Sequence, residues 1–295
     1  MKNIKFVASI VFAISLLGCS ISNHEGPKRE GLTETTEEIP MIPQDPSTPN
    51  YRKTVNNMPD SLYACGSRTV YPYLMLDKKK LSEDSFVNVS EKVFDSYTYI
   101  FNFSAVPFIA AGENAPGLAT YTKAIKEALA STEYAKSRRL LYEGYSYGFQ
   151  DNLSKIILHL PIALDPLKGK QLSKKWKNVF YAEYYFINFS VEAKVKAYTF
   201  SSDRVYVSDI YWGSYARIVV ATNHEKEKVF EAFNERLSNS RSKKWNEIFQ
   251  DQNYELYISL SHVPDSEKPV DSGQFFTVVT GRKLEPKPIF FTVRK

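Results

Sequence analysis

Residues 179–195 read VFYAEYYFINFSVEAKV and are rich in aromatic and β-branched side chains. Such residues favour extended backbone, because their side chains pack well on a pleated surface. The stretch therefore predicts one long strand, Val179–Val195. Two shorter runs of the same kind predict further strands at Val205–Ile210 and Ala216–Ala221.

C-terminal to these strands, the hydrophobic period changes to that of a helix. Val229, Phe230, Phe233 and Leu237 form one apolar stripe, which predicts a helix over Glu225–Leu237. A helical turn is expected at Trp245–Phe249. Three more strands are predicted after it, at Tyr254–Leu260, Phe275–Thr280 and Ile289–Val293.

Towards the N-terminus, alternation predicts an aromatic strand over Ser96–Val106, with Tyr97, Tyr99, Phe101 and Phe103 on one face. The remaining expected elements are a strand at Val70–Leu76, a helix at Leu118–Tyr142 and a tyrosine-rich loop at Gly144–Phe149. Long strands joined mostly by loops indicate an α+β domain around an antiparallel or mixed sheet.

The segment Asn152–Lys175 is ambiguous between strand and helix. Its apolar residues alternate as in a strand, but two prolines, Pro161 and Pro166, interrupt the pattern. The alternating residues are Leu158, Leu160, Ile162 and Leu164.

Cys19 follows a short export signal. Lys2 and Lys5 precede an apolar run, Phe6–Leu17, that is too short to span a bilayer as a stable helix. Leu16-Leu17-Gly18-Cys19 fits the pattern processed by the bacterial lipoprotein signal peptidase. The thiol then carries diacylglycerol and the freed amine another acyl chain, such as palmitate, which gives stable anchoring. The alternative is an ordinary signal peptide with a chance cysteine.

These patterns predict three regions. Residues 1–18 form a signal peptide, residues 19–57 form a disordered tether rich in Pro, Thr, Glu and Ser, and residues 58–295 form the folded core. We expect an exported protein, lipid-anchored to the bacterial envelope at the outer membrane or cell surface. The net charge of +5 is too small to indicate a nucleic-acid partner. Since Cys65 has no partner beside Cys19, we expect it to be a small buried residue.

Catalytic and metal-site patterns are weak. Gly144-Tyr145-Ser146-Tyr147-Gly148 matches a hydrolase nucleophile motif, but a predicted helix precedes it where that motif needs a strand. A turn is the simpler interpretation; a hydrolase would need His159, His224 or His262 as its base. The four histidines stand alone and no Gly-rich phosphate loop occurs, so we expect no metal, cofactor or enzymatic activity. Lys78–Lys80 and Lys174-Lys175 indicate solvated faces or contacts with anionic lipid.

The order of several segments resembles the cholesterol-dependent (thiol-activated) cytolysin family, over about residues 70 to 293. Tyr71-Pro72 with Leu74 and Leu76 is similar to an early strand of that family. Tyr211, Gly213 and Arg217 stand at its Tyr-Gly-Arg motif, with extra residues between them. The other matching segments are Tyr121–Tyr147, Tyr184–Ser190, Val207–Val220, Val229–Phe233, Trp245–Phe249, Tyr254–Leu260 and Val278–Thr280.

The resemblance implies a twisted, bent antiparallel central sheet flanked by helices. It also implies two helical clusters that refold into membrane-crossing hairpins in family members. The first maps onto Ser154–Lys175 and includes Leu158, Leu160, Ile162 and Leu164. The second would fall between Val279 and Pro288, where too few residues remain for a hairpin. We expect this chain to lack both the family's paired glycines after the Tyr254–Leu260 strand and its C-terminal sterol-binding domain.

By resemblance, the expected function is a role in oligomeric pore assembly at a membrane. The chain would act as a homo-oligomer or as the short partner of a longer cytolysin-like protein. Exposed strand edges would join the subunits, with Val205–Ile210, Ala216–Ala221 and Tyr254–Leu260 as candidates. The alternative is a surface binding or scaffold lipoprotein that keeps the fold without forming pores. Gly213 and Arg217 could equally mark a strand bend with a surface salt bridge.

Overall fold

The structure is a computed structural model of the whole chain, and all described residues belong to the compact unit Ile39–Lys295. Cys19 and most of the predicted Ser154–Lys175 segment lie outside them, and for 51–55 and 162–163 only the backbone is described. The described ranges are 51–55, 62–90, 93–137, 140–150, 162–163, 171–195, 201–239, 241–250, 253–261, 272–280 and 285–295.

Two long strands organise the molecule. β8 (Asn178–Ala193) and β9 (Arg204–Thr222) pair antiparallel from Asn178 opposite Thr222 to Glu192 opposite Asp209. Within the described ranges they belong to one sheet of eleven strands. The predicted strand Val179–Val195 is confirmed. The predicted break between Val205–Ile210 and Ala216–Ala221 is wrong, because the residues between them stay paired within β9.

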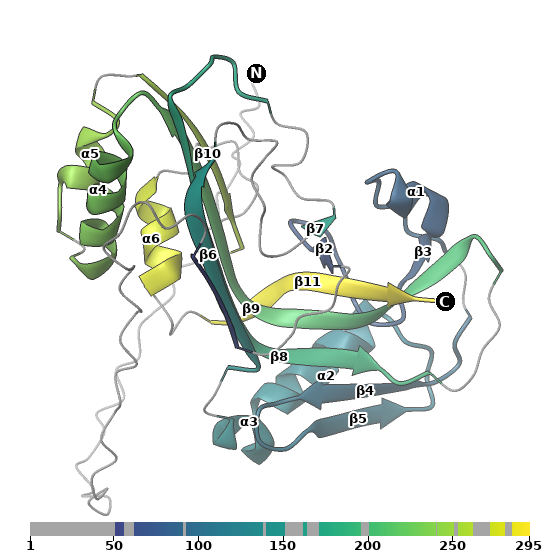
Figure 1. Ribbon diagram of the computed structural model, residues 1–295. Coiled ribbons are helices and arrows are strands. Elements are labelled where there is room, and N and C mark those ends of the chain that lie inside the picture. The colour runs from purple at the N-terminus through teal and green to yellow at the C-terminus, as the bar shows by residue number, and fades with distance from the viewer. Residues whose placement is uncertain are drawn as a thin grey trace, which may run out of the picture. The chain divides into compact units, whose positions relative to one another are not determined.

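Both long strands bend, which divides the sheet into an upper and a lower part (Figure 1). In the upper part, β6 (Tyr142–Gln150) pairs with β8, and β10 (Tyr254–Leu260) pairs with β9. β1 (Tyr51–Val55) continues the sheet beyond β6. β1 thus lies inside the range 19–57 that the sequence predicts as tether.

The lower part contains the remaining strands. β4 (Tyr97–Asn102) joins β8 to β5 (Phe108–Gly112), and β11 (Lys287–Arg294) pairs with β9. The shorter strands are β2 (Leu62–Ala64), β3 (Met75–Asp77) and β7 (Ile162–Ala163). Only the β2–β7 pairing is parallel among the pairings of the described strands, so the predicted bent antiparallel sheet is confirmed.

Three helices cover one face of the upper part: α4 (Lys226–Ser238), α5 (Lys244–Glu247) and α6 (Ser272–Thr280). α4 and α5 confirm the predicted helical segments. The predicted strand Phe275–Thr280 is wrong, because these residues form α6. Its buried side chains, Phe275, Phe276, Val278 and Val279, recur at the spacing of one helix face and pack on the sheet.

The predicted helix Leu118–Tyr142 is too long at its C-terminal end. α2 (Leu118–Leu129) is followed by the short α3 (Thr132–Lys136), whose start is capped by Ser131, and Tyr142 already belongs to β6. Both helices pack with the lower part of the sheet (Figure 1).

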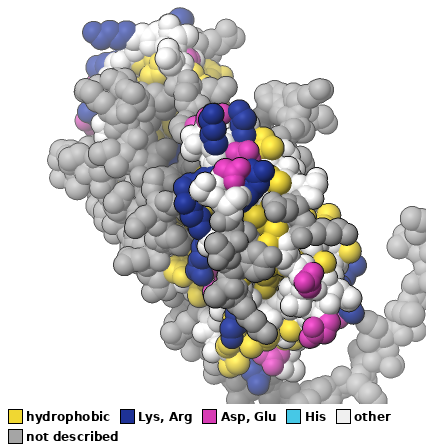
Figure 2. All heavy atoms as spheres, turned by 90° about the vertical axis from the view of Figure 1, so that its right-hand side faces the viewer, with side chains coloured by type: hydrophobic (Ala, Val, Ile, Leu, Met, Phe, Trp, Pro, Cys, Tyr) yellow, Lys and Arg dark blue, Asp and Glu magenta, His cyan; other side chains and the backbone are white. Residues whose placement is uncertain are grey.

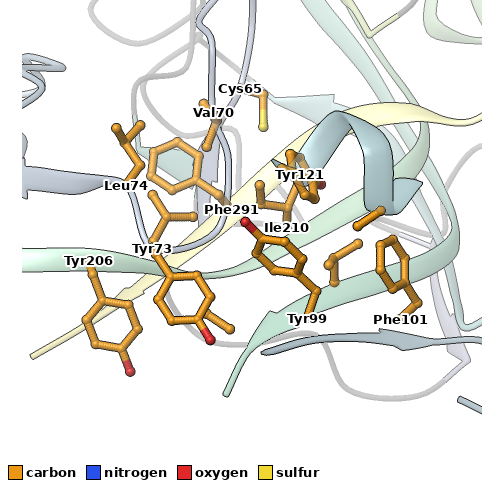
Figure 3. Close-up of a cluster of buried hydrophobic side chains, with 14 of the residues drawn as sticks. Cys65, Val70, Tyr73, Leu74, Tyr99, Phe101, Tyr121, Tyr206, Ile210 and Phe291 are labelled. Atoms are coloured by element: carbon orange, nitrogen blue, oxygen red, sulfur yellow. The ribbon is translucent and has the colours of Figure 1, made fainter. Parts of the chain in front are cut away.

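An aromatic core lies between these helices and the lower part of the sheet. Tyr99, Phe101 and Phe103, from the predicted aromatic face, are buried there, and Tyr121 of α2 packs against Tyr99 (Figure 3). The predicted strand Val70–Leu76 begins only at Met75. Tyr73 adopts a left-handed backbone conformation with φ 72°, which interrupts extended structure before that point.

The predicted loop Gly144–Phe149 is the middle of β6. A Cβ added at Gly144 would lie 2.4 Å from the hydroxyl oxygen and 2.5 Å from the ring of Tyr185, so this glycine makes room for a neighbouring aromatic residue. Ser146 is paired opposite Glu183 and is only 2% exposed. A strand interior with a buried hydroxyl is not a nucleophile elbow, so the hydrolase interpretation has no structural support.

Candidate functional site: the bend and the upper end of the sheet

The bend coincides with a β-bulge in β8. Ile187 pairs with Gly213 and Phe189 pairs with Trp212, which leaves Asn188 as the extra residue. A bulge bends a strand and shifts its alternation by one residue. Phe189 therefore lies on the same sheet face as Phe186, and both halves of β8 present aromatic side chains to helices.

Gly213 is required at this bend. Its backbone lies so close to β8 that an added Cβ would be 1.9 Å from the carbonyl oxygen of Phe186. The obstacle is backbone, so no side-chain rotation could relieve it. Gly213 is also paired with Lys287 of β11, which fixes its position from the other side. The predicted motif residue thus has a physical role in bending the sheet.

Trp212 ties the bend to α2. Its ring stacks on Phe189 with the centroids 5.5 Å apart and an interplanar angle of 14°. Its indole Nε1 donates to the hydroxyl of Tyr121 at 2.9 Å. Burial raises the pKa of Tyr121 well above its usual value, which keeps this hydroxyl neutral.

Arg217 forms a buried ion pair and not the surface salt bridge considered from the sequence. Its Nη2 donates to Oε1 of Glu183, directly opposite on β8, at 2.8 Å, and neither side chain is exposed. The hydroxyl of Tyr215 donates to the same oxygen at 3.4 Å, and the guanidinium lies over the Tyr215 ring. Desolvation lowers the pKa of Arg217, but its carboxylate partner favours the charged form.

Tyr211, the third predicted motif residue, lies in a separate buried cluster at the bend with Tyr185 and Tyr215. Its ring meets that of Tyr142 edge-on at 6.1 Å. Burial, assisted by the negative charge of Asp209, raises its pKa well above the usual value. Tyr215 belongs to this cluster and also donates to Glu183, so it connects Tyr211 to the ion pair of Arg217.

Two long connections leave the upper end of the sheet side by side. At this end Gln150 is opposite Val179, and Thr222 lies between Asn178 and Tyr254. The connection 151–177 joins β6 to β8, and the connection 223–253 joins β9 to β10. The region between Val279 and Pro288, where too few residues remain for the hairpin that the resemblance implies, lies between α6 and β11.

The first connection is described only in part. Of the residues predicted to refold, Ile162 belongs to the backbone of β7 and Lys175 is exposed, whereas Ser154, Leu158, Leu160 and Leu164 lie outside the described ranges. At its end, the Nδ2 of Asn178 donates to the carbonyl oxygen of His224 at 2.7 Å, and Lys177 pairs with Glu225. The start of β8 is thus fastened to the second connection.

Glu255 of β10 also holds the first connection, which sequence reasoning missed. Its carboxylate accepts hydrogen bonds from the backbone and side chain of Ser173 and from the indole of Trp176. These residues are about 80 positions away in the chain, so no local pattern could have indicated the contact.

No group of three or more His, Cys, Asp or Glu residues that could hold a metal ion occurs in the described ranges. No helix among the described residues is long and apolar enough to cross a membrane. The basic run Lys78–Lys80 forms part of α1 (Lys78–Ser82) and is exposed. Figure 2 shows basic and acidic side chains intermixed on the side of the molecule that carries α1.

Comparison with known proteins gives a consistent result. No family model and no curated protein matches the sequence. Among solved structures, pneumolysin matches with a TM-score of 0.55 at 13% identity, and the human-specific toxin intermedilysin with 0.53 at 14%. A non-hemolytic pneumolysin from Streptococcus pneumoniae matches with 0.56 at 13% identity. Each match covers 83% of this chain and 60% of the toxin. The fold is therefore cytolysin-like, and this chain spans about 60% of the length of those toxins.

Proposed function

We propose that this chain is an exported bacterial lipoprotein that assembles on a membrane through its sheet edges, as a short relative of pore-forming cytolysins. The observation that carries the proposal is the meander β6-β8-β9-β10, whose two long connections leave at one end. This arrangement allows both connections to extend the strands that they join without changing the order of the strands.

Strand extension would give two membrane-crossing hairpins. A tilted strand crosses a bilayer with about 10 residues, so a hairpin needs roughly 20. Both connections, 151–177 and 223–253, are longer than that. Since every backbone group in lipid must be hydrogen-bonded, such hairpins are stable only in a closed barrel built from several copies.

The two edges of the upper part would join the copies. Among the described strands, β10 pairs only with β9, whereas the outer edge of β6 is covered by β1. An unpaired edge offers free N–H and C=O groups to another strand. Assembly therefore requires β1 to leave β6 before a neighbour's β10 can pair there. The neighbour is a second copy or a longer cytolysin-like protein.

Acylation of Cys19 would place the protein at the outer membrane or cell surface, with membrane lipid as its constant partner. The support is the sequence Leu16-Leu17-Gly18-Cys19 after a basic and apolar leader. The anchor would hold the sheet near a bilayer and raise its local concentration there. We assign no catalytic residue and no cofactor.

The test uses the acylated full chain with liposomes that contain a trapped dye. The protein is added alone and together with a longer cytolysin-like homologue, on liposomes with and without sterol. The proposal predicts dye release and ring-shaped particles by electron microscopy in at least one mixture, both weakened by Cys19→Ser. Absence of release and of rings in every mixture would reject it.

A second candidate function is a surface binding or scaffold lipoprotein. The observation that favours it is that β1 pairs with the outer edge of β6, so this edge is not available to another molecule. A scaffold needs no strand exchange, so a disulfide that fixes β1 to β6 would leave its binding unchanged. The same disulfide would abolish ring formation if the chain assembles as proposed.

A further inference from the structure

We propose that Glu255 is a latch that holds the end of the first connection against β10 and so restrains strand extension. The inference rests on the proposed function, because it identifies what holds the described end of this connection, residues 171–176, beside β10. The latched segment is Gln171–Trp176, immediately before β8.

The contacts are concentrated on one carboxylate. Glu255 accepts from the backbone N–H groups of Ser173, at 2.9 and 3.0 Å to its two oxygens, and of Lys174, at 3.2 Å. It also accepts from the hydroxyl of Ser173, from Nε1 of Trp176 at 2.7 Å and from the hydroxyl of Tyr257 at 3.2 Å. Hydrogen bonds to an ionised group are stronger than neutral ones, so this site holds the segment through charge.

Neighbouring groups reinforce the contact. The hydroxyl of Tyr257 also donates to the carbonyl oxygen of Gln171 at 2.9 Å. Trp176 is buried in a cluster with Val179, Tyr181, Val219 and Ala221, and the ammonium of Lys174 lies 5.7 Å from the centre of its ring. The donors hold the pKa of Glu255 at about 2 despite the opposing effect of its desolvation, which agrees with a carboxylate kept ionised by its partners.

The register of the sheet shows why the latch opposes extension. Glu255 is opposite Ala221, and Ala221 is opposite Val179 on its other side. If β8 continued in register beyond Asn178, Trp176 would lie opposite His224. That position is three residues from Val179, or about 10 Å further along the strand. A direct hydrogen bond from Trp176 to Glu255 cannot survive that shift, so extension and the latched contact exclude each other.

Hydrogen exchange of the purified full chain without membranes tests the latch itself. Glu255→Gln keeps the size of the side chain but removes its charge, and Glu247→Gln, at an exposed position of α5, is the matched control. The latch predicts at least tenfold faster exchange in residues 171–176 for Glu255→Gln and no change for Glu247→Gln. Unchanged exchange in Glu255→Gln would overturn the proposal.

A milder variant protects the test against misfolding. Ser173→Ala removes one hydroxyl from an exposed position, so the fold should tolerate it. It is expected to speed exchange in residues 171–176 severalfold, while exchange in β8 stays at the wild-type level. If Ser173→Ala and Glu255→Gln both leave the segment as protected as in the wild type, the carboxylate is not what holds it.

A reversible lock separates the latch from the pore function. In Ser173→Cys/Glu255→Cys, a short reducible thiol cross-linker joins the two positions, and reduction releases them. Where wild-type protein releases liposome dye, the latch predicts at least tenfold slower release in the cross-linked form and full recovery on reduction. Equal rates in both forms would refute the latch. Failure of the wild type to release dye under every condition would refute the pore function, and hydrogen exchange would still decide on the latch.

Discussion

Glu183 of β8 and Arg217 of β9 face each other across the two central strands, and neither side chain reaches solvent. The Nη2 atom of Arg217 lies 2.8 Å from Oε1 of Glu183. Tyr215 contacts both residues, and its pKa is raised well above its usual value by burial and by the charge of Glu183. A buried ion pair of this kind fixes strand register, because a slip by one residue would leave both charges unpaired.

The ion pair should behave differently when one or both partners are changed. Glu183→Leu or Arg217→Met alone leaves an uncompensated buried charge and is expected to lower the free energy of unfolding by about 3–5 kcal/mol. The double variant Glu183→Leu/Arg217→Met should lower the free energy of unfolding by much less than the sum of the two single variants. Urea unfolding of the four proteins in a double-mutant cycle measures this coupling. Additive costs would show that the pair is not coupled.

Gly213→Ala should strongly destabilise the protein. The new methyl group would press on the backbone of Phe186, and relief requires the bent strands to separate, at a cost of about 3 kcal/mol. Gly117→Ala is the matched control, since nothing lies within 4 Å of its added Cβ, and should cost less than about 1 kcal/mol. Thermal unfolding of both variants checks the difference. Similar melting temperatures would contradict the role of Gly213 in the bend.

Trp212→Phe should loosen α2 from the bend. Phenylalanine keeps the stacking on Phe189 but cannot donate to the hydroxyl of Tyr121, so we expect a loss of about 1 kcal/mol. Tyr121→Phe should cost a similar amount, and combining the two changes should add little. Hydrogen exchange in α2 is the readout. A fully additive double variant would show that the two groups do not act together.

The latch should weaken in acid. The pKa of Glu255 is about 2 when latched and 4.5 in its ordinary state, so its contribution is complete above about pH 4.5 and is lost as the pH falls towards 2. Protonation weakens the contacts from Ser173, Lys174, Trp176 and Tyr257 together. The ratio of exchange rates in residues 171–176 between Glu255→Gln and wild type should therefore approach one across this window. A ratio that is constant with pH would contradict the assignment.

Elements whose packing follows local pattern were predictable from the sequence. The strand patterns of β8 and β10 and the apolar helical stripe of α4 are visible in the sequence itself. These three predictions are confirmed. α6 was predicted as a strand because its aromatic and β-branched residues favour strands, whereas burial of one helix face against the sheet decided otherwise.

The site itself was predictable only in outline. Tyr211, Gly213 and Arg217 were singled out by resemblance, but the bulge at Asn188 and the partner of Arg217 depend on pairing between distant strands. Gly144 also depends on a distant residue: the sequence predicts it as part of a loop, although it accommodates the Tyr185 side chain within a strand. The contact between Glu255 and Ser173 is equally non-local.

Cross-linking between copies tests edge-to-edge assembly most directly. Glu143→Cys on β6 and Leu260→Cys on β10 place thiols at opposite edges on the same sheet face. The two acylated single variants are mixed on liposomes with a short thiol cross-linker, and Ala111→Cys on β5 replaces Leu260→Cys in the control. The account predicts cross-linked dimers for the first mixture only, and only on membranes. Membrane-bound protein that stays monomeric, or cross-links equally in both mixtures, would contradict it.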